Sequence, residues 1–130
     1  MYEWRSHTAE IELAIEAETE EEVFADAVAA FAELVALESN EVLQKRAVAL
    51  EAPDRASLLV DWLQELIFLA DTESFVAERA EDLRLEAGSL AGTLVGRRAA
   101  FEPLVKAATY HGLRFTREGD MWHARVVLDV

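Results

Sequence analysis

Residues 58–72 read L-L-V-D-W-L-Q-E-L-I-F-L-A-D-T and predict a strongly apolar helix that carries two acids. Apolar side chains occupy most of its circumference, which is typical of a helix that neighbouring elements cover on nearly every side. Asp61 and Glu65 lie four residues apart and therefore share one helical face. Like charges at that spacing cost about 0.2–0.5 kcal/mol, so this face is either solvated or used in binding.

Helix boundaries can be read outward from this stretch. Pro53-Asp54 is a stop followed by an N-cap, so the helix is expected over roughly residues 55–70. Thr19 and Glu22 form a T-x-x-E capping box. The capping box predicts an earlier helix that runs to about Leu37, with a polar turn at 71–74 after the later helix.

Alternating apolar and polar residues predict strands on both sides of the two helices. These strands are expected over 10–17, 42–52, 83–95 with a bend at Gly88-Ser89 and Gly92, 104–115 and 121–130. A loop is expected over 97–103 and a hairpin turn over 118–120. Because no strand–helix unit repeats, the sequence predicts a single α+β domain over 1–130, with both helices packed on one face of a mostly antiparallel sheet.

Composition excludes several classes of protein. The 130 residues include no cysteine, which rules out disulfides, thiolate metal sites and a cysteine nucleophile. The formal net charge of −14 argues against direct, tight binding of nucleic acid, but it is compatible with divalent cations or a basic protein partner. Acidity that only aids solubility is the alternative. Without a signal peptide or an apolar run of ~20 residues, we expect a cytoplasmic monomer with no membrane segment.

Acidic residues near both ends of the chain could meet. Glu10 opens the first predicted strand, and Asp129 stands beside the carboxylate of Val130. If the first and last predicted strands are neighbours, these three carboxylates converge and could bind a hard cation such as Ca²⁺ or Mg²⁺. The alternative is that they are simply solvated, as most exposed acids are.

Residues 106–112 read K-A-A-T-Y-H-G and are expected on a strand. His111 could act as an acid or base near neutral pH, or it could be a hydrogen-bonded structural residue. His7 and His111 with nearby carboxylates could suggest zinc, but their spacing matches no standard zinc signature. No serine stands in a G-x-S-x-G context, and no nucleotide-binding fingerprint is present.

Four segments together resemble the archease family. They are S-H-T-A-E at 6–10, the helix at 58–72, K-A-A-T-Y-H-G at 106–112 and L-D-V at 128–130, in the family's order and at similar spacing. The resemblance implies a non-enzymatic accessory protein that activates a GTP-dependent tRNA-splicing and RNA-repair ligase. Such a protein promotes guanylylation of the ligase's active-site histidine and so permits multiple turnover.

The resemblance also implies roles for particular residues. The family's divalent cation is bound by an acid of the H-T-A-D motif, the penultimate Asp and the C-terminal carboxylate, which match Glu10, Asp129 and Val130. Calcium is expected in crystals, with Mg²⁺ or Mn²⁺ as alternatives in function. Glu10 replaces the family's usual Asp, and 97–103 lacks the acidity that is common there. Residues that would contact the ligase or support the site are His7, Asp61, Glu65, Lys106 and His111.

Two other classes of function remain open at this point. One is a chaperone-like module that binds proteins of nucleic-acid metabolism. The other is a small metal-dependent hydrolase that would use the acids with His7 or His111, although the missing nucleophile motif argues against it.

Overall fold

The protein was analysed as a computed structural model that describes residues 1–7, 10–36, 38–100 and 105–130. Along the chain, the described residues form nine elements: β1 (Tyr2–His7), β2 (Glu10–Ala17), α1 (Glu20–Val35), β3 (Gln44–Glu51), α2 (Arg55–Glu73), β4 (Phe75–Glu86), β5 (Ser89–Arg98), β6 (Ala107–Glu118) and β7 (Met121–Asp129).

Both helices begin at the predicted caps. The hydroxyl of Thr19 accepts a hydrogen bond from the Glu22 N–H at 3.1 Å. The carboxylate of Asp54 accepts one from the Ser57 N–H at 2.7 Å, and this bond holds the pKa of Asp54 below its usual value. Side-chain oxygens at these positions satisfy backbone N–H groups that have no partner in the first helical turn.

The end of α2 differs from the prediction. Residues 71–73 continue the helix, so the predicted turn at 71–74 is wrong except at Ser74. Ser74 adopts a left-handed conformation with φ 54°, and its N–H donates to the Ala70 carbonyl at 3.1 Å. No glycine or proline interrupts 71–73, so nothing stops the helix before this cap. The predicted end of α1 at Leu37 lies outside the described residues.

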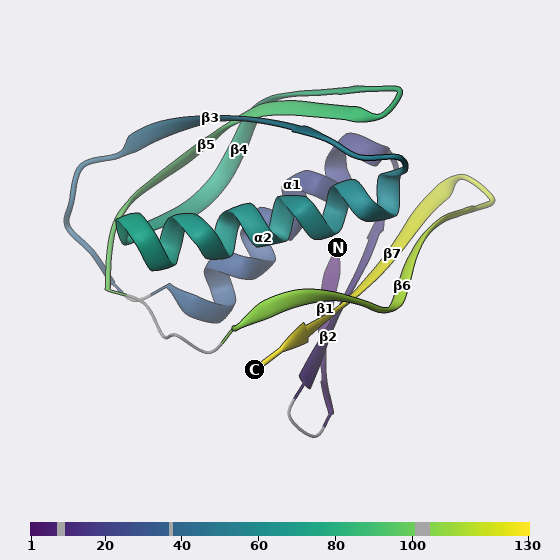
Figure 1. Cartoon of the computed structure of the whole chain (residues 1–130), viewed down its shortest axis with the longest axis horizontal. Coiled ribbons are helices and arrows are strands. Elements are labelled where there is room, and N and C mark those ends of the chain that lie inside the picture. Colours follow the sequence, from purple (N-terminus) through teal and green to yellow (C-terminus); the bar gives the residue numbers. More distant parts are fainter. Residues whose placement is uncertain (8–9, 37, 101–104) are drawn as a thin grey trace.

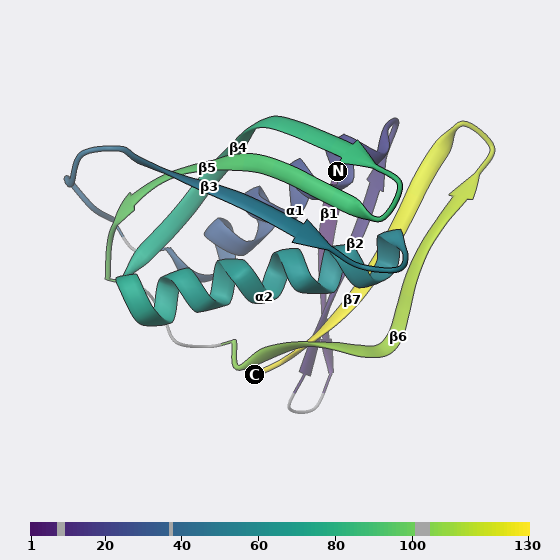
Figure 2. The ribbon, with the colours of Figure 1, turned by 45° about the horizontal axis from the view of Figure 1, so that its top comes forward.

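The strands form two antiparallel sheets, with orders β1-β2-β7-β6 and β3-β5-β4. Helix α1 contacts β2 and β4, while α2 contacts β6 and β4, so each helix touches both sheets. Figures 1 and 2 show α2 running between β3 and β6. The α+β class with two helices against antiparallel strands is confirmed. The division into two sheets, and strand β1, were not predicted.

The core lies between the helices and the inner faces of the sheets. Trp62 of α2 is fully buried, and its indole Nε1–H donates to the Phe24 carbonyl of α1 at 3.0 Å. The two aromatic rings meet edge to face, with centroids 6.3 Å apart. This contact ties the helices together and satisfies the one polar atom of the indole ring. Other fully buried large side chains are Leu13, Leu58, Leu63, Phe75, Leu94 and Leu128.

The strands also depart from the predicted boundaries. Strand β5 continues to Arg98, which pairs with Phe75 of β4. Arg97 Nε donates to Glu78 Oε2 on the neighbouring strand at 2.5 Å, and this bond raises the pKa of Arg97. The predicted loop is therefore wrong at 97–98, and residues 101–103 lie outside the described part. Strand β6 starts at Ala107 rather than 104.

Strand β6 contains an irregularity that the sequence reading missed. Thr109 pairs with Val127 and Arg114 pairs with Arg125, so residues 110–113 stand opposite the single residue Val126. Gly112 within this bulge has φ +66°, a conformation that favours glycine. Bulges of this kind bend an edge strand and disrupt its pairing. Among the described residues, no helix has the length and hydropathy needed to cross a bilayer.

Candidate functional site

Segments from three parts of the chain meet at one end of the four-stranded sheet. Glu10 of β2 and Asp129 of β7 are directly opposite residues in the antiparallel register. Ala107 of β6 is the partner of Asp129 on its other side, and the Lys106 N–H donates to the Asp129 carbonyl at 2.8 Å. The first predicted strand and the last predicted strand are therefore neighbours, as the proposed convergence of carboxylates requires.

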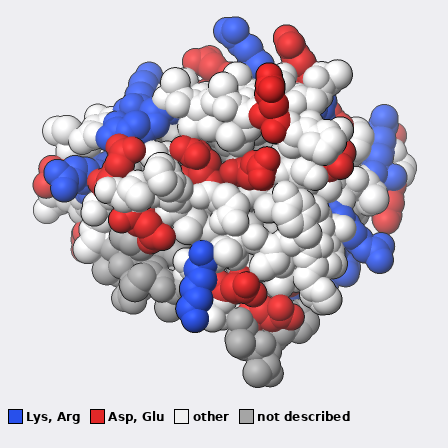
Figure 3. Space-filling view, in the orientation of Figure 1, with Lys and Arg blue, Asp and Glu red and all other residues white. Residues whose placement is uncertain are grey.

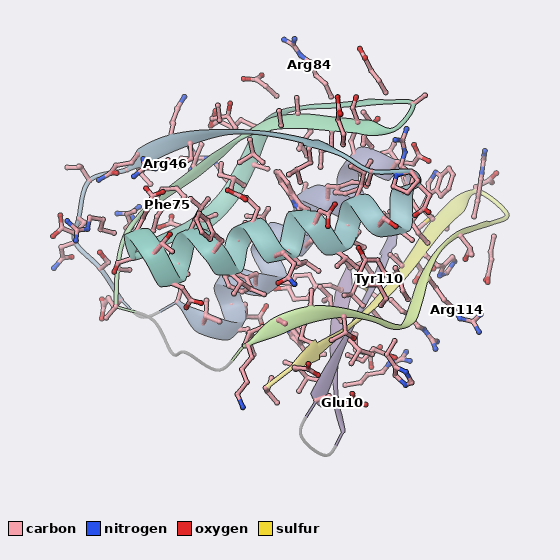
Figure 4. All side chains as sticks on the ribbon, in the orientation of Figure 1. Glu10, Arg46, Phe75, Arg84, Tyr110 and Arg114 are labelled. Atoms are coloured by element: carbon pink, nitrogen blue, oxygen red, sulfur yellow. The ribbon has the colours of Figure 1, made fainter. Side chains whose placement is uncertain are left out.

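Glu10 and Asp129 lie on the face of the sheet that points away from the core. Side chains alternate along a strand, and Val126 and Leu128 of β7 are buried on the other face. Asp129 is exposed, Glu10 is half-buried, and neither forms an ion pair with another described residue. Figure 4 shows Glu10 at the lower end of the sheet. Like charges directly opposite each other are destabilising, and a bound cation would relieve this repulsion.

Glu10, Asp129 and the Val130 carboxylate form what we call the acidic corner. Their oxygen donors suit a hard divalent cation. Two carboxylates on adjacent strands, with the carboxylate of Val130 one residue further, are the ligand type that Ca²⁺ and Mg²⁺ prefer. In the described part of the chain, no three His, Asp or Glu side chains are placed to hold a metal ion. The third ligand that the resemblance predicts is the carboxylate of Val130, which is not a side chain.

The two candidate histidines do not add to this group. The side chain of His7 lies outside the described residues, although its backbone pairs with Glu10 across the β1–β2 hairpin. His111 is exposed on the bulge of β6, beside Tyr110, which is 61% exposed. Within the described residues, the His111 side chain forms no hydrogen bond and belongs to no group that could hold a metal ion.

Asp61 and Glu65 are half-buried on the solvent-facing side of α2, and we call these two residues the acidic stripe. Together with Gln64, Phe68 and Asp71 they line a shallow hollow, and the Phe68 ring is 55% exposed. Figure 3 shows acidic side chains gathered over the middle of this face, where α2 lies. Neither Asp61 nor Glu65 pairs with a cation in the part of the chain that the structure describes. The hollow therefore offers an apolar side chain surrounded by unneutralised carboxylates.

Gln64 connects this stripe to the acidic corner, and the sequence reading missed it. Its carboxamide donates to the Ala108 carbonyl and accepts from the Ala108 N–H, both at 3.3 Å. The side chain thus satisfies the outer edge of β6 where a further strand would otherwise pair. Because Ala108 is two residues from Lys106, α2 fixes the strand that supports Asp129. A single polar residue on the exposed face of a predicted helix gives no signal of this contact.

Comparison with known proteins gives the family that the four sequence segments resemble, over nearly the whole chain. Residues 2–130 match the Archease protein family (MTH1598/TM1083). Protein archease of Methanosarcina barkeri is 34% identical over 140 aligned residues, which cover 99% of this chain and 95% of that protein. Protein archease of Methanosarcina mazei is 36% identical over 139 aligned residues, with the same coverage.

Two solved structures are similar in fold. The solution structure of protein 1598 of Methanobacterium thermoautotrophicum has a TM-score of 0.68 and 28% identity, and the likeness covers 99% of this chain and 98% of that one. The crystal structure of "an archease, possible chaperone" from Thermotoga maritima also has a TM-score of 0.68, with 25% identity and coverage of 100% and 98%. The chain belongs to the archease family.

Proposed function

We propose that this chain is a non-enzymatic activator of a GTP-dependent RNA ligase of tRNA splicing and RNA repair, and that it acts through a divalent cation held by Glu10, Asp129 and the Val130 carboxylate. Family membership supports the accessory role. The observation that carries the cation site is the register of β2 and β7, which places Glu10 directly opposite Asp129. These are two of the positions that match the family's metal ligands.

The residues around the corner have separate tasks in this proposal. Glu10 and Asp129 supply charged oxygen ligands, and the Lys106 backbone holds the end of β7 in place. When bound, the cation would neutralise phosphate charge during guanylyl transfer in the ligase. Glu10 has one methylene more than the aspartate usual in the family, so its carboxylate reaches further from β2.

The acidic stripe of α2 is the proposed contact with the ligase. Asp61 and Glu65 would face basic side chains of the partner, and the exposed Phe68 would supply an apolar anchor between them. Complementary charge steers association and fixes the orientation of a complex. An acidic hollow with an aromatic side chain fits a basic protein surface better than it fits a phosphate.

The test is ligation turnover by the cognate ligase with GTP and Mn²⁺ or Mg²⁺, with the protein added at substoichiometric amounts. Wild type should convert single turnover into multiple turnover, and Asp129→Asn should not. Asp120→Asn is the matched control, because Asp120 is exposed in the β6–β7 hairpin turn and the charge change is identical. Activation by both variants would refute the cation site, and no activation by wild type would refute the accessory role.

A chaperone-like binding module is the second candidate. Phe68, Tyr110 and Val42 expose 55%, 61% and 72% of their surface, which gives scattered apolar contacts. The archease of Thermotoga maritima with a similar structure is described as a possible chaperone. This function predicts suppressed aggregation of several unrelated clients with no dependence on Asp129. Turnover of a phosphoester by the isolated protein would instead support the hydrolase.

A further inference from the structure

A second like-charged pair lies on the same sheet face as the acidic corner. Arg114 of β6 and Arg125 of β7 are directly opposite residues in the antiparallel register. Both side chains are exposed, and neither forms a hydrogen bond or an ion pair with another described residue. Two like charges directly opposite each other on paired strands are destabilising. We call Arg114 and Arg125 the arginine pair.

The neighbouring positions on this face make the arginine pair unusual. One row away, Arg5 Nη1 lies 3.4 Å from Glu12 Oε1, and on the other side His123 Nε2 lies 3.9 Å from Glu16 Oε1. In the row of the arginine pair, the next residue on β2 is Ala14, which has no charge to offer. The chain has 26 acidic residues against 12 Lys and Arg, yet none of the acids neutralises this pair within the described residues.

The surroundings keep the arginine pair accessible. Arg114 follows directly after the bulge at 110–113, which lifts the edge strand out of regular pairing. Beside Arg125 and Ala14 the outer face has a hollow, whose charged or titratable lining also includes Glu3, Arg5, Glu16 and His123. Figure 4 shows Arg114 projecting away from the body of the protein. Two adjacent guanidinium groups present a set of planar donors that suits the oxygens of a phosphate.

From this geometry we propose that the arginine pair binds a phosphate of the single-stranded RNA on which the partner ligase acts. This inference rests on the proposed function for the presence of RNA. Arg125 and Asp129 are four residues apart on one face of β7, which is about 14 Å at ~3.4 Å per residue. One RNA strand could therefore place one phosphate on the arginine pair and bring a second phosphate near the acidic corner.

The overall charge limits this contact. A formal net charge of −14 repels a nucleic acid, so the isolated protein binds RNA weakly and the contact matters chiefly when the ligase supplies further cations. Each neutralised phosphate of a single strand contributes a slope of about −0.7 to log K against log salt. One phosphate held by both arginines therefore predicts a slope steeper by roughly 0.7 than that of a variant that lacks both.

The first measurement is fluorescence anisotropy of a short labelled single-stranded RNA, titrated with the isolated protein at low salt. The double variant Arg114→Gln/Arg125→Gln should bind about ten-fold more weakly than wild type. The control is Arg84→Gln/Arg98→Gln, which removes the same charge from exposed arginines outside the four-stranded sheet. It should stay within about two-fold of wild type, because a phosphate contact is local.

The second measurement separates this inference from the proposed function. Ligase guanylylation is measured without RNA, and ligation is measured as a function of RNA concentration. The double variant should stimulate guanylylation as wild type does, while the KM for RNA rises several-fold. If wild type itself fails to stimulate guanylylation, the proposed function fails. The anisotropy titration still shows whether the arginine pair binds RNA.

Three outcomes would overturn the inference. Equal RNA binding by wild type and the double variant would show that the arginine pair holds no phosphate. Equal loss in the Arg84→Gln/Arg98→Gln control would show a non-specific charge effect. Displacement of the RNA by a polyglutamate peptide at similar concentration would point to an acidic protein segment instead. Arg114→Lys/Arg125→Lys should keep the salt dependence of wild type, because the charge remains.

Discussion

Strand β7 contributes one residue to each of two like-charged pairs, the acidic pair of Glu10 with Asp129 and the arginine pair. The pairs differ in the sign of their charge, in the regularity of the strand pairing, and in whether sequence motifs or the structure identify them. Glu10 and Asp129 meet in an unbroken register at the end of the strand, whereas Arg114 and Arg125 meet just after a bulge. Both pairs keep repulsion that a single substitution would remove. We infer that repulsion retained on an exposed sheet face marks a place where a ligand supplies the missing charge.

The background charge acts on the two pairs in opposite ways. The net charge of −14 adds to the repulsion within the acidic pair and offsets part of the repulsion within the arginine pair. The acidic pair should therefore cost more stability without its ligand. Added salt should relieve the acidic pair more strongly, because screening removes the whole-protein field as well as the local repulsion.

The strongest way to disturb both pairs together is to remove their shared support. Leu13 is fully buried on the core side of β2, between the rows that hold the two pairs. Leu13→Ala should lower the free energy of unfolding by about 2–5 kcal/mol, measured by urea denaturation. Val42→Ala, at a site that is 72% exposed, should change it by less than about 0.5 kcal/mol. Equal effects would mean that Leu13 is not buried beneath the two pairs.

A change at Gln64 should loosen β6, which carries Arg114, without loosening the pairing of β2 with β7, which carries Glu10 and Asp129. Gln64→Ala removes both hydrogen bonds to Ala108 and should cost about 1–3 kcal/mol, at roughly 0.5–1.5 kcal/mol each. Hydrogen exchange at the Ala108 amide should accelerate, while amides shared between β2 and β7 stay protected. Glu65→Ala, one residue away, serves as the control. Loss of protection across all strands would show that α2 supports the whole sheet rather than β6.

Single charge removals compare the two pairs directly. Without ligand, in the presence of a chelator and at low salt, Asp129→Asn and Arg114→Gln should each raise the free energy of unfolding by about 0.2–1 kcal/mol. The gain should be larger for Asp129→Asn and should shrink in high salt for both. Thermal unfolding at two salt concentrations measures it. Destabilisation by either variant would show that its pair carries no repulsion.

The smallest effect is the response of α2 to acid. The Ser57 N–H lowers the pKa of the folded Asp54 carboxyl, so its contribution to stability is complete above the pKa of the unfolded chain. This contribution is lost as the pH falls through the lower, folded pKa. Asp54→Asn keeps a capping oxygen but cannot titrate, so its unfolding curve should depend less on acid pH. An unchanged pH profile would mean that the cap is not formed in solution.

Much of the fold could be predicted because its signals are local. The Thr19 and Asp54 caps fix the starts of both helices, and the alternation in β2 and β7 fixes their buried faces. Strand β1 was missed because its half-buried alternation is short, and the predicted turn at 71–74 failed because nothing there breaks a helix. The bulge in β6 had Gly112 as its single local sign.

The acidic corner was predictable in its members, but the arginine pair was not. Glu10, Asp129 and Val130 match family motifs, so the resemblance named them from the sequence, and the register then placed Glu10 opposite Asp129. The pairing of Arg114 with Arg125 depends on how many residues the bulge consumes, because a shift of one residue would turn a strand's side chains to the other face. Spacing along the chain does not contain that number.

The class of fold, the buried helix at 58–72, the helix caps and the family could be predicted from the amino-acid sequence, since each rests on neighbouring residues or on motifs. The division of the strands into two sheets, the hold of Gln64 on the edge of β6, and the charges that face one another across β7 became visible in the folded chain alone. The physical reason is that side-chain periodicity sets the face of a strand, whereas strand order and register depend on contacts between distant segments.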